Sequence, residues 1–264
     1  MTDSLGSPQC IERIAIGIEY DGTAYSGWQD QPHAPSVQRC LNEAISLVAA
    51  GETACVGAGR TDAGVHATGQ AAHFDTAVRR SNRSWLLGIN ANLPADICVL
   101  WAQPVAEAFH ARFAATSRSY RYRILNRQVR SALERNRVWW VRQPLDIAAM
   151  QAAAQCLVGR HDFSAFRAAA CQSHSPIREM TQLDISRDAD AVVVECTANA
   201  FLHHMVRNIV GSLVKVGLGE AEPEWVAGLL ESRDRKLSGM TAPAAGLTLT
   251  SVGYPPELLR LPEE

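Results

Sequence analysis

The sequence predicts an α+β protein in which two ferredoxin-like halves, each with the order β-α-β-β-α-β, join into one broad, mixed but mainly antiparallel sheet. Two observations predict this fold. Strand-like and helix-like segments alternate in the same order in both parts of the chain. The 264 residues, 47% of them hydrophobic, are enough to bury two cores. We expect helices on one face of the sheet and a basic cleft on the other, with halves spanning 1–112 and 113–264.

The first half begins with residues 13–20, RIAIGIEY, which alternate apolar and polar as a half-buried strand does. Asp21 and Gly22 signal a turn after it. Ser36 is a suitable N-cap for a helix over 37–50, where apolar residues recur at helical spacing. The other elements expected here are a strand near 53–57, a strand over 68–75, a helix near 81–90 with Trp85, Leu86 and Ile89 facing inward, and a strand over 97–105.

The second half repeats this order in pattern, although not in residues. It begins with a strand over 117–125, SRSYRYRIL, and a helix is expected over 146–158. The remaining elements are a hairpin over 181–199 with its turn near Asp188–Asp190, a helix over 202–217 and a last strand over 247–253.

Composition narrows the class of protein. The seven cysteines are odd in number and form no CxxC pair, which argues against a disulfide framework and a zinc knuckle. No apolar run reaches the roughly 18 residues of a membrane span. The first residues, MTDSLGSPQC, have neither the basic nor the apolar block of a signal peptide. We therefore expect a cytoplasmic protein without a membrane partner.

The charge is unevenly distributed along the chain. The net charge is −2, yet residues 112–142 hold nine arginines and a single acidic residue, Glu134. A basic segment in an acidic chain predicts a polyanionic partner bound on one face.

The stretch GAGRTDAGVHATGQ, residues 57–70, has three possible interpretations. As a dinucleotide-binding turn, its GxG would need a third glycine at position 62, where Asp62 stands instead and would repel a pyrophosphate. As a metal site, Asp62, His66 and His73 would share a face only on a helix, which the glycines disfavour. Two further histidines, His203 and His204, would point about 100° apart on the predicted helix, so we expect no metal.

The third interpretation is a turn that presents the carboxylate of Asp62. Glycines on both sides permit a tight backbone, and Arg60 is close enough to pair with Asp62 or with a phosphate. An ionised carboxylate suits a nucleophile. The alternative is an ordinary surface turn in which the aspartate only shapes the loop. Residue spacing leaves these two alternatives open.

Several long motifs resemble the tRNA pseudouridine synthase A family, in the family's order and over about residues 12–254. The central one is GRTDAGVHATGQ at 59–70. The others are EYDGTAYSGWQ at 19–29, NANLP at 90–94, FHARFAATSRSYRYRI at 109–124, CQS at 171–173 and NAFLHHMVRNIVGSLVKVG at 199–217.

The resemblance implies roles for individual residues. Asp62 matches the catalytic aspartate, and Tyr120 matches the tyrosine that stacks on the target base. Arg60 matches an arginine that holds the flipped nucleotide, and Arg207 matches the arginine that pairs with the carboxylate. The residues matching RNA-contacting positions are Arg80, Phe109, His110, Ala111, Arg112, Phe113, Ala170, Cys171, Gln172, Ser173 and His174.

The resemblance also implies the reaction. It is the isomerisation of uridine to pseudouridine in the anticodon arm of tRNA (positions 38, 39 and 40), by a homodimer without cofactor or metal. The base must leave its stack to reach Asp62, at a cost of a few kcal/mol. The alternatives are a pseudouridine synthase for other tRNA positions or RNAs, a small-molecule enzyme with an aspartate nucleophile, and a non-catalytic RNA-binding module. Such a module would gain nothing from a carboxylate beside a phosphate-rich ligand.

Overall fold

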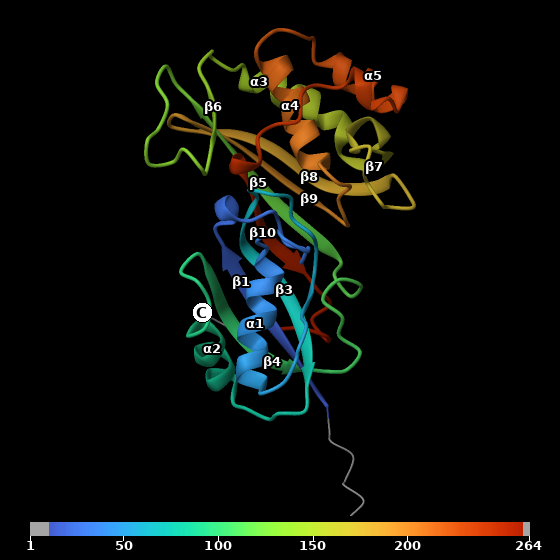
Figure 1. Ribbon diagram of the computed structural model, residues 1–264. Coiled ribbons are helices and arrows are strands. Elements are labelled where there is room, and N and C mark those ends of the chain that lie inside the picture. Colours follow the sequence, from blue (N-terminus) through green and yellow to red (C-terminus); the bar gives the residue numbers. More distant parts are fainter. Residues whose placement is uncertain (1–10, 261–264) are drawn as a thin grey trace, which may run out of the picture.

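The computed structural model describes residues 11–260 and is built around one ten-stranded sheet that runs through an elongated molecule (Figure 1). Eight strands follow the order β4-β1-β3-β10-β5-β9-β8-β7, and the short strands β2 and β6 pair with β3 and β5. The strands are β1 (Glu12–Tyr20), β2 (Val56–Gly57), β3 (His66–Thr76), β4 (Ile97–Val105), β5 (Ser117–Asn126), β6 (Trp139–Val141), β7 (Gly159–Asp162), β8 (Ile177–Asp188), β9 (Ala191–Ala198) and β10 (Leu247–Gly253).

Both halves have the predicted β-α-β-β-α-β order. In the first half, α1 (Val37–Ala49) and α2 (Asn82–Asn90) pack on β1, β3 and β4. Ser36 and Ser81 cap these helices by accepting hydrogen bonds from backbone N–H groups three residues on. In the second half, β5, α3 (Ile147–Ala154), β8, β9, α4 (Met205–Gly217) and β10 follow one another along the chain. Their spatial order β10-β5-β9-β8 matches the order β4-β1-β3-β2 of the first half.

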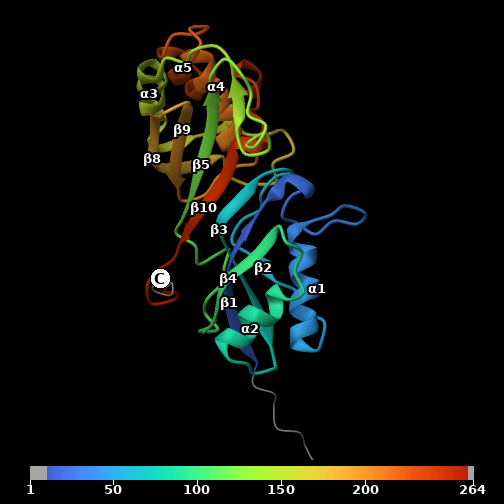
Figure 2. The ribbon, with the colours of Figure 1, turned by 90° about the vertical axis from the view of Figure 1, so that its left-hand side faces the viewer.

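The last strand joins the two halves. β10 pairs antiparallel with β5 of its own half and parallel with β3 of the other, at Thr248↔His66 and Leu249↔Ala67. Figure 2 shows β10 between β5 and β3 at the waist of the molecule. On β10, Leu247 is buried in the core of the second half, and Leu249, on the same face, is buried in the core of the first. The helices of both halves therefore cover the same face of the sheet, as predicted.

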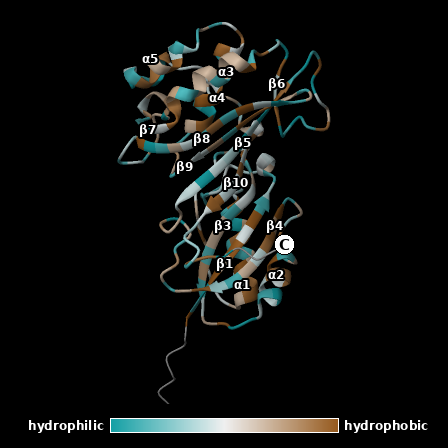
Figure 3. Ribbon diagram, turned by 180° about the vertical axis from the view of Figure 1, so that it is seen from behind, coloured by the Kyte–Doolittle hydropathy of each residue, from teal (hydrophilic) through white to brown (hydrophobic). Residues whose placement is uncertain are grey.

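The opposite face of the sheet is open in the second half, whereas in the first half Ala15 of β1 is buried there against Phe109, Ala111 and Leu259. Along β9, fully buried residues alternate with half-buried ones, and β8 buries only Met180, Leu183 and Ile185. Figure 3 shows the sheet from behind, with both hydrophilic and hydrophobic residues along β8. No helix in residues 11–260 has the length and apolar character needed to span a membrane.

Several predicted boundaries were wrong. The strand expected near 53–57 is only Val56–Gly57, because the preceding residues bond to side chains of α1 instead. The helix expected over 146–158 ends at Ala154 and continues as a 3-10 turn. The helix expected from 202 begins at Met205, because His204 has a left-handed backbone, with φ of 62°. The turn of the 181–199 hairpin lies at Ala189, as predicted.

Three elements were not predicted. Strands β6 and β7 have three and four residues, too few to show an alternation of period two. Helix α5 (Glu224–Ser232) packs on the second core through Val226 and Leu229. It is a nine-residue helix, and its glutamates, Glu224 and Glu231, are exposed.

Candidate active site

Asp62 is presented by a tight turn in the loop between β2 and β3. The Val65 N–H donates to the Asp62 carbonyl at 3.1 Å, and Gly64, the third residue of this turn, has φ of 77°. A positive φ at that position is the signature of a type II turn and explains a glycine there. Of the two neighbours of Asp62, Thr61 is buried and Ala63 is exposed. The turn therefore lies at the edge of the loop, and the Asp62 side chain is directed out of it.

The loop is fastened to its surroundings through its backbone. The Trp28 N–H donates to the Thr61 carbonyl at 3.1 Å, and the Tyr20 hydroxyl lies 2.8 Å from the Thr61 Oγ1. Gly27 allows this approach, because a Cβ there would lie 2.5 Å from the Thr61 oxygen. Gln70 donates to the carbonyl of Gly59 at 2.9 Å. The position of Asp62 is thus set by fixed neighbours on both sides.

Arg118, on β5, ties this loop to two other segments. Its guanidinium donates to the carbonyls of Ala58, Arg112, Ala115 and Asn199 at 2.8–3.1 Å. Burial lowers the pKa of the Arg118 guanidinium. All four of its hydrogen-bond acceptors are carbonyl oxygens, however, and these favour the charged form. Arg118 therefore joins the Asp62 loop of the first half to β5 and to the chain that leads into α4.

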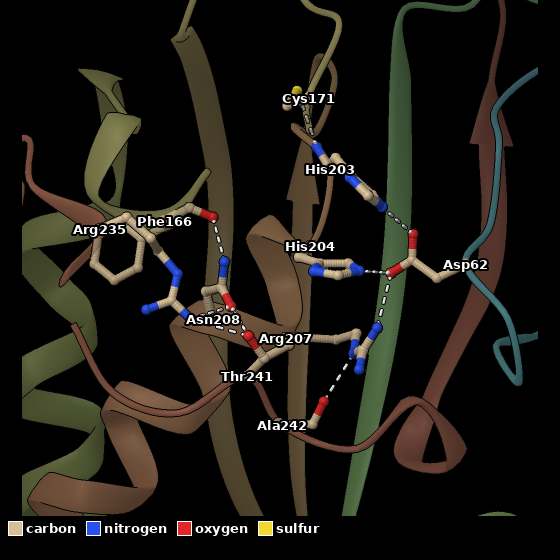
Figure 4. Close-up of polar contacts among 10 residues, drawn as sticks. All are labelled: Asp62, Phe166, Cys171, His203, His204, Arg207, Asn208, Arg235, Thr241 and Ala242. Atoms are coloured by element: carbon tan, nitrogen blue, oxygen red, sulfur yellow. Dashed lines mark hydrogen bonds and ion pairs between the residues drawn. The ribbon is translucent and has the colours of Figure 1, made fainter. Parts of the chain in front are cut away.

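Three cationic or potentially cationic side chains surround the carboxylate of Asp62 (Figure 4). Arg207 Nη1 lies 3.0 Å from Oδ2, His203 Nε2 lies 3.3 Å from Oδ1, and His204 Nε2 lies 3.4 Å from Oδ2. The Asp62 side chain is 20% exposed and that of Arg207 is 15% exposed. Asp62 comes from the first half and its partners from the second, so the cluster forms where the halves meet.

Arg207 is held from behind by the chain that follows α5. Its Nε donates to the Ala242 carbonyl at 2.7 Å, and the Ala242 N–H donates back to the Arg207 carbonyl at 3.1 Å. The next residue, Asn208, is fully buried and bonds to Phe166, Arg235 and Thr241 (Figure 4). This network fixes the first turn of α4, and with it the guanidinium that faces Asp62.

We expect Gly211→Ala to destabilise the protein by about 2 kcal/mol. A Cβ at Gly211 would lie 1.8 Å from the Met240 carbonyl oxygen, and the backbone strain exceeds the gain of about 1 kcal/mol in helix propensity. Displacing Met240 also moves Ala242, so activity should fall as well. The control is Gly228→Ala on α5, where a Cβ meets nothing within 4 Å. Chemical denaturation of both variants tests this, and equal unfolding free energies would contradict it.

Tyr120 lies on β5 between the two cores and packs against both. Its ring contacts Phe201 edge-on at 5.0 Å between centroids. Burial, together with the nearby Tyr20 and the Asp62 carboxylate, raises the pKa of Tyr120 above its usual value. The phenol is therefore neutral and close to Asp62.

The site lies on the helix-covered face of the sheet. Tyr120 pairs with Cys196 and Leu249, which are buried in the two cores, whereas its neighbours Ser119 and Arg121 pair with half-buried Thr197 and Glu195 on the open face. Tyr120 therefore lies on the helix-covered face, whereas the basic cleft was expected on the opposite face.

Arg60 is exposed. Its Nη1 donates to Gln172 Oε1 at 3.3 Å and not to the Asp62 carboxylate, which was one of its two expected partners. Ala170, Gln172 and His174 are exposed on the same segment, and Cys171 and Ser173 are half-buried. The structure thus brings the predicted 170–174 segment to Arg60, beside the Asp62 cluster.

Cys171 is linked directly to that cluster. Its Sγ accepts a hydrogen bond from the His203 N–H at 3.5 Å. Burial raises the pKa of the Cys171 thiol, but the N–H groups of Ser173 and His203 and the Arg167 guanidinium outweigh burial and leave this pKa below its usual value.

The predicted 109–113 segment divides into buried and exposed residues. Phe109 and Ala111 are fully buried in a small core with Ala15 and Leu259. Phe113 is 77% exposed, and the Arg112 guanidinium lies 5.6 Å from its ring centroid. Phe109 and Ala111 therefore shape this segment from inside, and a ligand reaches only His110, Arg112 and Phe113.

His73 on β3 holds the same segment, and we expect it to make stability depend on pH. Its Nδ1 accepts the Ala111 N–H at 3.2 Å, while burial and then the Arg13 charge lower its pKa to about 4. Since the unfolded histidine binds a proton near pH 6.5, stability is complete above that pH and is lost as pH falls toward 4, by on the order of 3 kcal/mol.

The check compares unfolding free energies between pH 7 and pH 4 for the wild type and His73→Gln. The decline should be shallower in the variant, because the group that must take up a proton on unfolding is gone. Parallel pH curves for the two proteins would contradict this assignment.

Arg80 lies away from Asp62. Its Nε donates to the Val48 carbonyl at the end of α1, and its guanidinium lies 5.9 Å from the Trp85 ring centroid. The structure does not bring Arg80 to the Asp62 cluster, although its side chain is exposed.

The arginines of residues 112–142 have more acidic neighbours in space than in sequence. Arg121, Arg127 and Arg137 pair with Glu195, Asp190 and Asp21, which all come from other segments. The sequence count of one acid overstated the positive charge of this region. Two contacts also anchor the loop before β6 to the first half. Arg137 pairs with Asp21, and His66 Nε2 lies 2.7 Å from the Asn136 carbonyl oxygen.

Sequence reasoning missed His203, His204 and Arg118. The two histidines were judged on helix geometry, but they precede α4 in a turn that directs both rings to Asp62. Arg118 was one of nine arginines in a basic segment, and no local pattern distinguishes an arginine that binds carbonyls from one that faces solvent.

Comparison with known proteins agrees with this arrangement. A family model described as tRNA pseudouridine synthase matches residues 16–114 and 153–255. Proteins named tRNA pseudouridine synthase A are 52% identical in Nitrosococcus oceani (92% of this chain, 94% of the relative) and 54% identical in Vibrio parahaemolyticus (93% of each). The protein of that name from Coxiella burnetii is 50% identical over 96% of this chain and 97% of its own length. Because the family model covers both halves and these relatives match nearly end to end, this protein belongs to the tRNA pseudouridine synthase family.

Proposed function

We propose that this isomerase converts uridine to pseudouridine at positions 38, 39 and 40 in the anticodon arm of tRNA, with Asp62 as the group that attacks or deprotonates the sugar. The observation that supports it is the Asp62–Arg207 pair, 3.0 Å long, which joins the two halves close to the neutral Tyr120. That the enzyme is a pseudouridine synthase acting on tRNA follows from its family. The tRNA positions and the role of Asp62 are our proposal.

The reaction needs little beyond a positioned carboxylate. The N1–C1′ bond of uridine breaks, the uracil turns, a C5–C1′ bond forms, and the proton lost from C5 is balanced by one gained at N1. No atom or electron is exchanged with another reactant, so the chain's own side chains suffice. Arg207 keeps the carboxylate oriented by occupying Oδ2, which leaves Oδ1 directed toward His203 and the exposed side of the cluster.

Tyr120 has a neutral hydroxyl and a half-buried ring. A phenol whose pKa is raised is a poor base, so we propose that it stacks on the flipped uracil and does not remove the C5 proton. Stacking on an aromatic ring contributes about 1–3 kcal/mol per base and offsets part of the cost of flipping.

The exposed residues around the Asp62 cluster include cations, which can bind RNA phosphates, and an aromatic ring, which can contact a nucleotide. Arg60 has one weak side-chain partner, Gln172, and is free to exchange it for a phosphate. Arg112 and Phe113 offer a cation and an exposed ring on a neighbouring segment. We propose that these groups contact the tRNA, and that the protein acts in the cytoplasm as a homodimer, as its family resemblance implies.

The test uses unmodified transcripts of a tRNA with uridines at positions 38, 39 and 40, and a matched transcript with cytidines there. Pseudouridine is mapped by carbodiimide treatment and primer extension, and RNA binding is measured in the same samples. Modification confined to these positions supports the proposal. Modification elsewhere overturns the assigned positions, and binding without any pseudouridine would indicate a non-catalytic RNA-binding module.

A further inference from the structure

The two histidines beside Asp62 have no assigned role. Their Nε2 atoms point at opposite oxygens of one carboxylate, at 3.3 and 3.4 Å, and one ligand atom from each of the three residues lies within 4.8 Å of the others (Figure 4). Within residues 11–260, no other group of three histidine, cysteine, aspartate or glutamate side chains meets this spacing.

We propose that Asp62, His203 and His204 form a binding site for a divalent transition-metal ion, best suited to zinc, and that the bound ion inhibits the enzyme. Two imidazoles and one carboxylate are a ligand set that zinc accepts in proteins. The inhibitory part rests on the proposed catalytic role of Asp62, whereas the binding of the ion does not.

The distances fit the ion. In a tetrahedral site with zinc–ligand bonds of about 2.0–2.1 Å, ligand atoms lie about 3.3–3.4 Å apart. One imidazole–oxygen separation of this size exists at each oxygen, His203 to Oδ1 at 3.3 Å and His204 to Oδ2 at 3.4 Å, and a turn of the carboxylate is needed to offer one oxygen to both rings. Three protein ligands leave a fourth position for water, and the His203 side chain is 40% exposed, so an ion can enter from solvent.

The backbone keeps the two rings together. His204 has φ of 62°, which turns the chain just before α4, and the ring centroids of His203 and His204 lie 4.0 Å apart. The hydrogen bond from the His203 N–H to Cys171 Sγ holds this turn from the other side. The imidazoles are therefore placed before any ion arrives, which lowers the cost of assembling the site.

Arg207 opposes the ion. Its guanidinium lies 3.0 Å from Oδ2 and places a positive charge beside the site. The affinity should therefore be below that of a structural zinc site, and a chelator should reverse binding. An ion held by Oδ1 would also occupy the side of Asp62 from which the sugar must approach, so that zinc and substrate compete.

Binding is tested on untagged, metal-free protein without RNA, by calorimetric titration with zinc and by the visible absorption of cobalt(II). The variants are His203→Asn and His204→Asn, with His33→Asn as the control. His33 and His204 both have a left-handed backbone, with φ of 65° and 62°, which asparagine tolerates. We expect one ion per chain in the wild type and the control, and at least about tenfold weaker binding in both test variants.

Inhibition is tested by the rate of pseudouridine formation with and without zinc, at constant magnesium, and after a zinc-selective chelator. The ratio of the two rates within each variant removes any change in its basal activity. Saturating zinc should lower the wild-type rate at least tenfold, reversibly, and the test variants should need about tenfold more zinc.

Three outcomes would overturn the proposal. Absence of saturable zinc binding, or equal affinity in all four proteins, would exclude the site. Zinc bound at the triad with an unchanged rate would exclude inhibition. Failure of the proposed function is distinct from both, because it would appear as a lack of pseudouridine in zinc-free wild-type samples.

Discussion

Replacing Asp62 by asparagine should abolish pseudouridine formation, lowering the single-turnover rate by about 10⁴-fold or more. Asparagine has nearly the same shape, so the turn closed by the Asp62 carbonyl and the Val65 N–H remains. The amide carries no charge and can neither attack the sugar nor accept a proton from it. Binding of tRNA should persist, and at low salt it should tighten, since a negative charge near the RNA phosphates has been removed.

The control for this variant is Asp188→Asn, at the exposed turn of the β8–β9 hairpin, which removes one charge far from Asp62 in the chain. It should retain the wild-type rate. An Asp62→Asn enzyme that keeps more than about a hundredth of that rate would show that the carboxylate is not the reacting group.

Replacing Arg207 by glutamine should lower the rate by about 10²–10³-fold while tRNA binding changes little. Arg207 makes two contacts, to Asp62 Oδ2 at 3.0 Å and to the Ala242 carbonyl at 2.7 Å. Glutamine is too short to keep both and carries no charge, so the carboxylate loses its fixed orientation. Arg207→Lys should recover part of the rate, because it restores the charge but not the fork that serves two acceptors.

Thermal unfolding separates this effect from misfolding. The lost hydrogen bond to Ala242 should cost about 1 kcal/mol, too little to unfold the protein at assay temperature. A glutamine variant with a rate within threefold of the wild type would show that the pair with Asp62 has no catalytic role.

The sequence predicted the fold well because most elements carry a strong local signal. RIAIGIEY alternates as a strand, and Ser36 caps α1 in the structure as expected. Elements whose limits depend on tertiary contacts were placed less well. Residues 53–55 are held by side chains of α1 and not by a neighbouring strand. The helix expected from residue 202 begins only at Met205, because His204 before it has a left-handed backbone.

The candidate site was predicted only in part. Glycine spacing around Asp62 left open a turn that presents a carboxylate or an ordinary surface turn, and family resemblance added the roles of Asp62, Tyr120 and Arg207. Position in sequence could not show that Phe109 and Ala111 are buried, or that Arg121 and Arg127 have acidic partners from β9 and the β8–β9 turn. Such contacts join residues far apart in the chain and produce no periodic pattern in the sequence.

The position of β10 near the end of the chain determines when, during synthesis, the active site can form. A ribosome makes β3 and β5 long before residues 247–253, and until that strand inserts between them the sheet does not continue from the half with the Asp62 loop to the half that carries Arg207. We therefore expect a nascent chain without β10 to lack an assembled Asp62 cluster. Cleavage that removes β10 would likewise separate the two halves of the site without touching any residue within it.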